Sequence, residues 1–339
     1  MQLPPASGGT LRVKIRVGPD RSPGGTVAAA LRQTLQSDDY DEFDLLADNA
    51  AEWEIPFDQP PSVSRRSFAL PSGQTLSYLQ WREDEPELVL LHGGAQHAHC
   101  WDNVLLALGR PALAVDLPGH GHSDHRSDHD YRPSRNAEAV AALVEARAPA
   151  ARCVVGMALG GLSAMHLVAQ VPGLFERAVL INASPAINGP GRPPTLTARG
   201  AMELIAARDS YATFEDLVCA VTPTTVQRSE GNLRRSLRHN AVRLPDGRWT
   251  WRFDTAIARQ AGGADDGPTP PPWAEFERMS IPTLLVVGEQ CTYVSRDDVD
   301  EMRRVHPSLS VVTLEGVGET PESESPLIVA DLIASFTVI

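Results

Sequence analysis

The sequence predicts an α/β fold in which a mostly parallel central sheet is covered by helices on both faces. Short apolar runs recur along the chain, most of them separated by helical stretches, at 87–91, 112–116, 152–155, 177–182, 283–287 and 310–314. Strands that are apolar throughout are typical of parallel sheets buried on both faces. Alternating patterns at 65–70 and 75–81, joined by a Pro-Ser-Gly turn, predict a hairpin before these strands.

Residues 1–60 are predicted to form an N-terminal arm. Apolar and basic residues alternate over 11–17, which is the pattern of a half-exposed strand, and residues 26–36 are compatible with a short helix. Two interpretations of this arm remain open: a partly ordered segment, or a contact with a second copy in a homodimer. The acidic segment 38–58 carries interleaved aromatic residues, so we expect a helical segment packed at the edge of the core.

The core is predicted to comprise residues 61–185 and 280–339. Between them the alternation of strands and helices stops, and segment 186–279 is predicted to be a largely helical lid with a linker rich in glycine and proline at 261–272. A chain of 339 residues is long enough for one large domain with such an insertion.

Composition excludes several classes of partner. The net charge of −13 argues against nucleic acid. There is no apolar run of about 18 residues to span a membrane, and the first residues lack the features of a secretory signal, so we expect a cytoplasmic protein. The four cysteines are scattered and form no pair typical of a zinc site. The expected partner is a small-molecule substrate, without a metal or other cofactor.

Three motifs carry the strongest signal. They are His-Gly-Gly at 92–94, Asp-Leu-Pro-Gly-His-Gly-His-Ser at 116–123, and Gly-Met-Ala-Leu-Gly at 156–160 between a predicted strand and a predicted helix. In this order they resemble the α/β-hydrolase superfamily, and the resemblance covers about residues 60–339. Segments 94–101, 237–240 and 246–254 also resemble an actinobacterial branch of that superfamily.

The resemblance implies a Ser-acid-His triad that this chain lacks. Ala158 stands where the serine of the Gly-x-Ser-x-Gly turn is expected. Glu319 stands where the histidine is expected, and the two customary acid positions hold Asn182 and Cys291. Backbone N–H groups do not depend on the side chain, so those of Gly94 and Leu159 are still expected to form an oxyanion hole.

These departures favour a function other than serine hydrolysis. We expect a cofactor-free enzyme in which Glu319 is the general base for elimination, isomerisation or cyclisation of a small apolar compound, such as a polyketide-like or other secondary metabolite. One alternative is a pseudohydrolase that binds a ligand without turnover. The other is an engineered variant of an ordinary ester hydrolase with serine replaced by alanine, which explains Ala158 but not Glu319.

The loops after the strands supply the candidate substrate-binding residues, because ligands bind at the carboxyl ends of strands in such folds. They are Gln96, His97, His99, Trp101 and Tyr293. For His99 and Trp101 a structural role is equally compatible with the sequence, since both could pin the loop to the lid.

Overall fold

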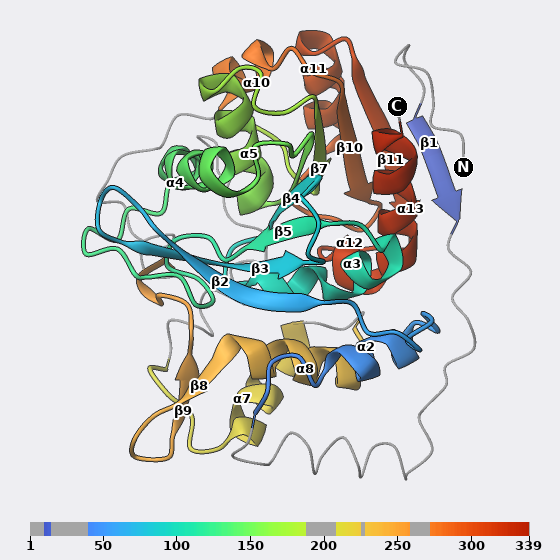
Figure 1. Ribbon diagram of the computed structural model, residues 1–339. Helices are drawn as coiled ribbons and strands as arrows, with labels where there is room; N and C mark the ends of the chain where they lie inside the picture. The colour runs from blue at the N-terminus through green and yellow to red at the C-terminus, as the bar shows by residue number, and fades with distance from the viewer. Residues whose placement is uncertain (1–9, 15–39, 188–207, 225–227, 258–271, 339) are drawn as a thin grey trace.

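The central feature is a nine-stranded sheet in the order β1-β11-β10-β7-β6-β4-β5-β3-β2 (Figure 1). The computed structural model describes residues 10–14, 40–187, 208–224, 228–257 and 272–338. The strands from β1 to β5 in this order are parallel, and β3 and β2 continue the sheet antiparallel. The strands of this sheet are β1 (Thr10–Lys14), β2 (Val63–Ala69), β3 (Thr75–Trp81), β4 (Leu88–Leu91), β5 (Ala112–Val115), β6 (Cys153–Met157), β7 (Arg177–Ile181), β10 (Thr283–Gly288) and β11 (Leu309–Glu315).

The predicted fold class is confirmed by this sheet. The six apolar runs form β4, β5, β6, β7, β10 and β11, and the alternating segments form the hairpin β2–β3. Every residue of β4, β5, β6 and β10 is buried, as expected for strands covered on both faces.

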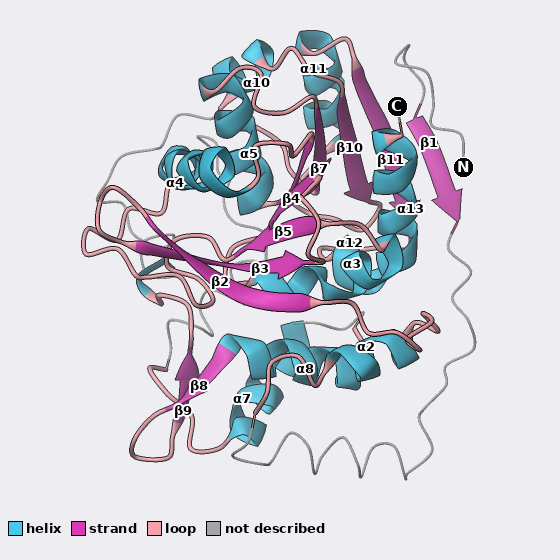
Figure 2. Ribbon diagram, viewed as in Figure 1, coloured by secondary structure: helices cyan, strands magenta, loops and turns pink. Residues whose placement is uncertain are grey.

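Helices cover both faces of the sheet (Figure 2). Side chains of α4, α5, α10 and α11 share one apolar cluster, and side chains of α2, α3 and α13 share the other. The bounds of the helices are α2 (Leu46–Glu52), α3 (Asp102–Leu108), α4 (Pro133–Arg147), α5 (Leu159–Gln170), α10 (Trp273–Arg278), α11 (Arg296–Val305), α12 (Pro321–Glu324) and α13 (Pro326–Thr337), with a 3₁₀ turn, η1 (Ala98–Trp101), before α3.

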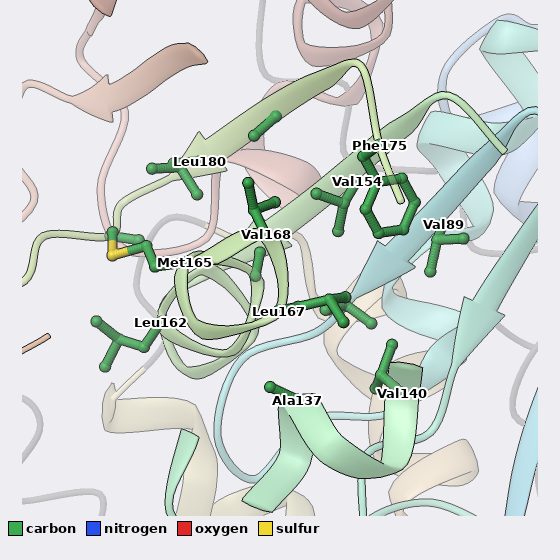
Figure 3. Packing of buried hydrophobic residues seen from close by; sticks show 14 of the residues in the cluster. Val89, Ala137, Val140, Val154, Leu162, Met165, Leu167, Val168, Phe175 and Leu180 are labelled. Carbon is green, nitrogen blue, oxygen red and sulfur yellow. The ribbon is translucent and has the colours of Figure 1, made fainter. Parts of the chain in front are cut away.

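Helix α5, which starts at the candidate site, is fixed by its apolar side chains. Figure 3 shows Leu162, Met165 and Val168 of this helix among side chains of the sheet, with Val140 of α4 nearby. All four are at most 7% exposed. Burying a side chain of this size contributes about 1.5–3 kcal/mol, so the position of α5 is determined by packing rather than by its loops.

The N-terminal region adds two elements to this core. Strand β1 pairs in parallel with β11 at the edge of the sheet. In the acidic segment, Leu45, Leu46 and Ala50 are buried at α2, as predicted from the apolar residues there. The helix expected at 26–36 lies outside the described residues, and a homodimer contact through the arm stays a prediction.

The inserted segment forms a small cluster of its own. Its described elements are α7 (Phe214–Val221), η2 (Thr222–Thr224), α8 (Glu230–Asn240) and the hairpin β8 (Ala241–Arg243) and β9 (Trp249–Trp251). We did not predict this hairpin, although Asp246-Gly247 is a turn signal and Gly247 has φ +87°. Almost all of the predicted linker at 261–272 lies outside the described residues. Within the described ranges no helix has both the length and the apolar character to cross a membrane.

Candidate active site

The candidate residues follow the carboxyl ends of neighbouring strands. Gly94 follows β4, Ala158 follows β6, Asn182 follows β7 and Glu319 follows β11. Met157 pairs with Ile181 at the ends of β6 and β7, so Ala158 and Asn182 lie side by side. The sheet therefore brings segments far apart in the sequence to one edge.

Ala158 occupies a strained turn between β6 and α5. Its φ of 44° and ψ of −109° are rare for a residue with a Cβ atom, and its N–H donates to the Ile181 carbonyl at 3.0 Å. A methyl group at Gly156 would overlap the backbone of Gly160, and one at Gly160 would overlap the Leu91 carbonyl. The turn is thus an intact nucleophile elbow that presents a methyl group.

The two predicted oxyanion donors lie on neighbouring elements. Leu159 is the first residue of α5, where an N–H group has no acceptor within the helix. A Cβ atom at Gly94 would lie 4.0 Å from Cδ2 of Leu159, which places the β4 loop directly opposite the start of α5. Backbone donors on two rigid elements are the arrangement that stabilises a developing oxyanion.

Gln96 braces the β4 loop through both ends of its amide group, and its predicted role in substrate binding stays a prediction. Its Oε1 accepts from the Gly93 N–H at 2.8 Å, and its Nε2 donates to Oε1 of Glu322 at 3.1 Å. Glu322, in α12, is fully buried, and burial raises the pKa of its carboxyl to about 7. We missed Glu322, since nothing in the local sequence separates it from its acidic neighbours.

Glu319 is half-buried in the turn after β11. Its Oε1 accepts from the N–H of Thr292 at 3.2 Å and from its hydroxyl at 2.5 Å. Oε2 is buried and accepts no N–H or O–H hydrogen bond from the described residues, while the Cys291 thiol acts on this carboxyl as a hydrogen-bond donor. Burial raises the pKa of this carboxyl, and the hydrogen bonds from Thr292 and Cys291 oppose that rise. Burial, together with Glu319, also raises the pKa of Cys291 to about 12, so that side chain is a neutral thiol.

Tyr293 lies near this carboxyl but is mainly a packed side chain. It is partly buried against the apolar cluster on the α4–α5 face. Burial raises its pKa, and the charge of Glu319 adds to that effect. A role for Tyr293 in substrate binding stays a prediction.

Asn182 is a structural bracket rather than a displaced catalytic acid. Its Nδ2 donates to the carbonyl groups of Gly318 at 2.9 Å and Glu319 at 3.1 Å, and its Oδ1 accepts from the Gly288 N–H at 2.9 Å. Fully buried, it ties the ends of β7 and β10 to the turn that carries Glu319. This bracket holds the Glu319 backbone next to the strand end beside Ala158.

His97 and His99 are buried in a contact between three parts of the chain. His99 pairs with Asp102 through Nδ1 at 2.9 Å and with Glu42 through Nε2 at 3.0 Å. Burial disfavours its charge, but these two carboxylates outweigh it and raise the pKa of His99 to about 9. The His99 ring stacks on His239 of α8 at a centroid distance of 3.8 Å. The imidazolium therefore joins the N-terminal segment, the β4 loop and the inserted segment.

Two further residues that were predicted to line the pocket, His97 and Trp101, are buried inside the protein. His97 is 3% exposed and its Nε2 donates to the Ser236 carbonyl at 3.1 Å, while the Tyr40 hydroxyl and Nδ1 of His239 share a hydrogen bond of 2.5 Å. Trp101 is fully buried in the apolar cluster beneath α3. The burial of His99 and Trp101 fits the alternative in which both fasten the loop.

The same contact offers a possible set of metal ligands. Ligand atoms of His99, Asp102 and His239 lie within 4.8 Å of one another. The two imidazole rings, however, are nearly parallel at 11°, so their lone pairs lie in parallel planes and cannot converge on one ion. Both nitrogens of His99 are also occupied by carboxylates. The geometry favours a stacked ion-pair network over a metal centre.

Comparison with known proteins agrees with this architecture. A model of the alpha/beta hydrolase family matches residues 88–332. The esterase Rv0045c of Mycobacterium tuberculosis is 35% identical over 294 residues, which cover 86% of this chain and 94% of the esterase. A solved structure of that esterase has a TM-score of 0.77 at 34% identity and covers 88% of this chain and 99% of its own. The sn-1-specific diacylglycerol lipase ABHD11 of Mus musculus is 29% identical over 315 residues, covering 85% of this chain and 98% of the lipase.

These relatives correct the functional prediction made from the sequence. The expectation of a non-hydrolytic lyase, isomerase or cyclase of secondary metabolism is wrong, because the similar proteins are named as an esterase and a lipase. In that expectation, the absence of the serine was taken to mean that the type of reaction had changed. The predicted superfamily, in contrast, is confirmed by the family match and by the fold. The chain belongs to the α/β-hydrolase family.

Proposed function

We propose that the protein hydrolyses carboxylic esters through direct attack of water, with Glu319 as the general base. The observation that carries this proposal is the Glu319 carboxyl, which occupies the predicted histidine position with a raised pKa and has a buried oxygen that accepts no N–H or O–H hydrogen bond from the described residues. A carboxylate that is poorly solvated is a stronger base than one in water.

The route follows from the groups at the sheet edge. Water attacks the ester carbonyl carbon and gives one proton to Glu319, while the N–H groups of Gly94 and Leu159 stabilise the oxyanion. When the tetrahedral intermediate collapses, the alkoxide leaves and takes the proton back from Glu319. The products are a carboxylic acid and an alcohol, and the carboxylate is regenerated. Ala158 forms no covalent intermediate and leaves room beside the carbonyl carbon.

The substrate class is proposed from the relatives. An esterase and a diacylglycerol lipase act on esters, and this chain shares most of its length with both. We therefore propose an ester of an apolar acyl group, which is a small-molecule partner and requires no cofactor in this route.

The proposal is tested with a series of chromogenic acyl esters. Glu319→Gln keeps the size of the side chain and removes the base, so kcat should fall about 10²–10⁴-fold, the usual contribution of a general base. Glu145→Gln is the matched control, since Glu145 is exposed on α4. In the parent the rate should rise with pH as the Glu319 carboxyl ionises, with a midpoint above that of an ordinary glutamate.

Two results would contradict the proposal. If Glu319→Gln hydrolyses the esters as fast as the parent, Glu319 is not the base. If the parent binds the esters without releasing alcohol, the protein is not an ester hydrolase.

A further inference from the structure

The loop that carries one oxyanion donor is held from outside by a buried acid. Residues 93–96 form a tight turn in which the Gln96 N–H donates to the Gly93 carbonyl at 3.3 Å and Ala95 has φ 59°. The Gln96 side chain closes this turn on Gly93 and then reaches Glu322 of α12. We propose that Glu322 is a positioning residue of the oxyanion hole, which fixes the peptide groups of Gly93 and Gly94 through Gln96.

The orientation of the Gln96 amide carries the argument. The Gly93 N–H can only donate, so the atom facing it must be the amide oxygen. An ionised Glu322 can only accept, so the atom facing it must be the amide nitrogen. Both ends therefore demand the same orientation, and the amide has no alternative rotamer that satisfies both partners. A Cβ atom at Gly93 would lie 2.8 Å from Oε1 of Gln96, so a larger residue there would displace the Gln96 side chain from its hydrogen bond.

The surroundings of Glu322 favour a role in fixing this turn rather than general packing. Its Oε1 also accepts from the Ser323 hydroxyl at 3.0 Å, and its Oε2 is buried with no hydrogen-bond partner in the described part of the chain. The charged and titratable groups that act on it are Arg228, which favours its ionised form, and Glu324 and Cys100, which do not. Burial is the largest influence and favours the neutral acid.

Protonation of Glu322 should loosen the turn. A neutral carboxyl can donate its proton to the Gln96 amide oxygen, which would turn the amide nitrogen towards the Gly93 N–H and break that hydrogen bond. The inserted segment holds the neighbouring peptide independently, because Asn240 donates to the Ala95 carbonyl at 2.8 Å. The effect of Glu322 is therefore expected at Gly93 and Gly94 rather than over the whole loop.

Backbone amide resonances of the full chain, followed by NMR in the absence of any substrate, test this inference. Glu322→Leu removes the acceptor and should move the Gly93 amide proton upfield, with the Gly94 resonance following. Glu322→Gln offers a donor and an acceptor, as the protonated carboxyl does, so its Gly93 resonance should lie at the low-pH position of the parent at every pH. In the parent the Gly93 resonance should also move with pH around neutrality, and this movement should vanish in Glu322→Gln. Glu145→Gln is the control for an exposed glutamate.

The inference is overturned if Glu322→Leu moves Gly93 and Gly94 no more than the control does. It is also overturned if the pH-dependent movement of Gly93 persists in Glu322→Gln, which decides the matter should Glu322→Leu fail to fold. The role of the Gly94 N–H as an oxyanion donor rests on the ester hydrolysis proposed above. The two fail separately, because these resonances are measured without turnover, whereas the ester assay compares the parent with Glu319→Gln and leaves Glu322 unchanged.

Discussion

Replacing Glu322 by glutamine should change how stability depends on pH. Burial raises the pKa of this fully buried carboxyl from 4.5 to about 7. A pKa difference of this size corresponds to about 3 kcal/mol of the free energy of unfolding. No reduction for solvent screening applies, because the carboxyl is not exposed. It is a large share of the 5–15 kcal/mol that ordinarily separates a folded protein from its unfolded state.

The sign follows from where the protons are bound. Between pH 4.5 and 7 the unfolded chain ionises Glu322 while the folded protein keeps the proton, so the free energy of unfolding falls as pH rises. Below this window both states are neutral, and above it the loss is complete. In Glu322→Gln this loss is absent, and the variant should gain about 3 kcal/mol relative to the parent as the pH is raised through the window.

Urea unfolding of parent, Glu322→Gln and the exposed control Glu145→Gln at several pH values measures the effect. The glutamine leaves an amide N–H group without an obvious acceptor, which can cost about 1–3 kcal/mol at every pH. The informative quantity is therefore how the difference in free energy of unfolding between Glu322→Gln and the parent changes with pH. A difference that stays constant from acid to neutral pH would refute the reasoning.

Three further changes test other parts of the structure. Gly160→Ala should cost about 3 kcal/mol, because the methyl group meets the carbonyl at the end of β4. Gly94→Ala, where the nearest atom to the methyl group would be 4.0 Å away, should cost less in urea unfolding, and equal losses would contradict the packing argument. His99→Gln should lose about 3 kcal/mol more of the free energy of unfolding below pH 6.5 than above pH 9. The reason is that the ion pairs of His99, which raise its pKa, stabilise the fold only while the ring is protonated. A loss of stability independent of pH would argue against these ion pairs. Ala158→Ser combined with Glu319→His should be labelled by a fluorophosphonate probe that leaves the parent unlabelled, and equal labelling of Ala158→Ser alone would show that the histidine is not needed.

The sequence was sufficient to predict those parts of the fold that depend on local residue patterns. The apolar runs and the glycines around Ala158 predicted the strands and the elbow, because a buried parallel strand and a close helix approach each need particular residue types. The hairpin β8–β9 escaped because its strands have three residues each, too short for an alternating pattern.

The supporting residues of the site could not be predicted in the same way. Glu322 and Gln96 are separated by 226 positions, and neither carries a local sign of the hydrogen bond between them. Asn182 was correctly placed at the end of its strand, yet its role as a bracket depends on the carbonyl groups of a distant turn. Partners of this kind are set by the tertiary fold, so a motif identifies the position but not what the side chain does there.

The elbow shows why the family could be recognised although its usual nucleophile is absent. The unusual backbone at Ala158 persists without a serine to present, with φ 44°. It is imposed by the sheet and by α5, since the glycines at 156 and 160 allow an approach that larger residues would block. The Leu159 N–H is placed by the same backbone and survives the loss of the serine. Stabilisation of an oxyanion therefore depends on the fold, whereas activation of a nucleophile depends on side chains, and we propose Glu319 for that second task in this chain.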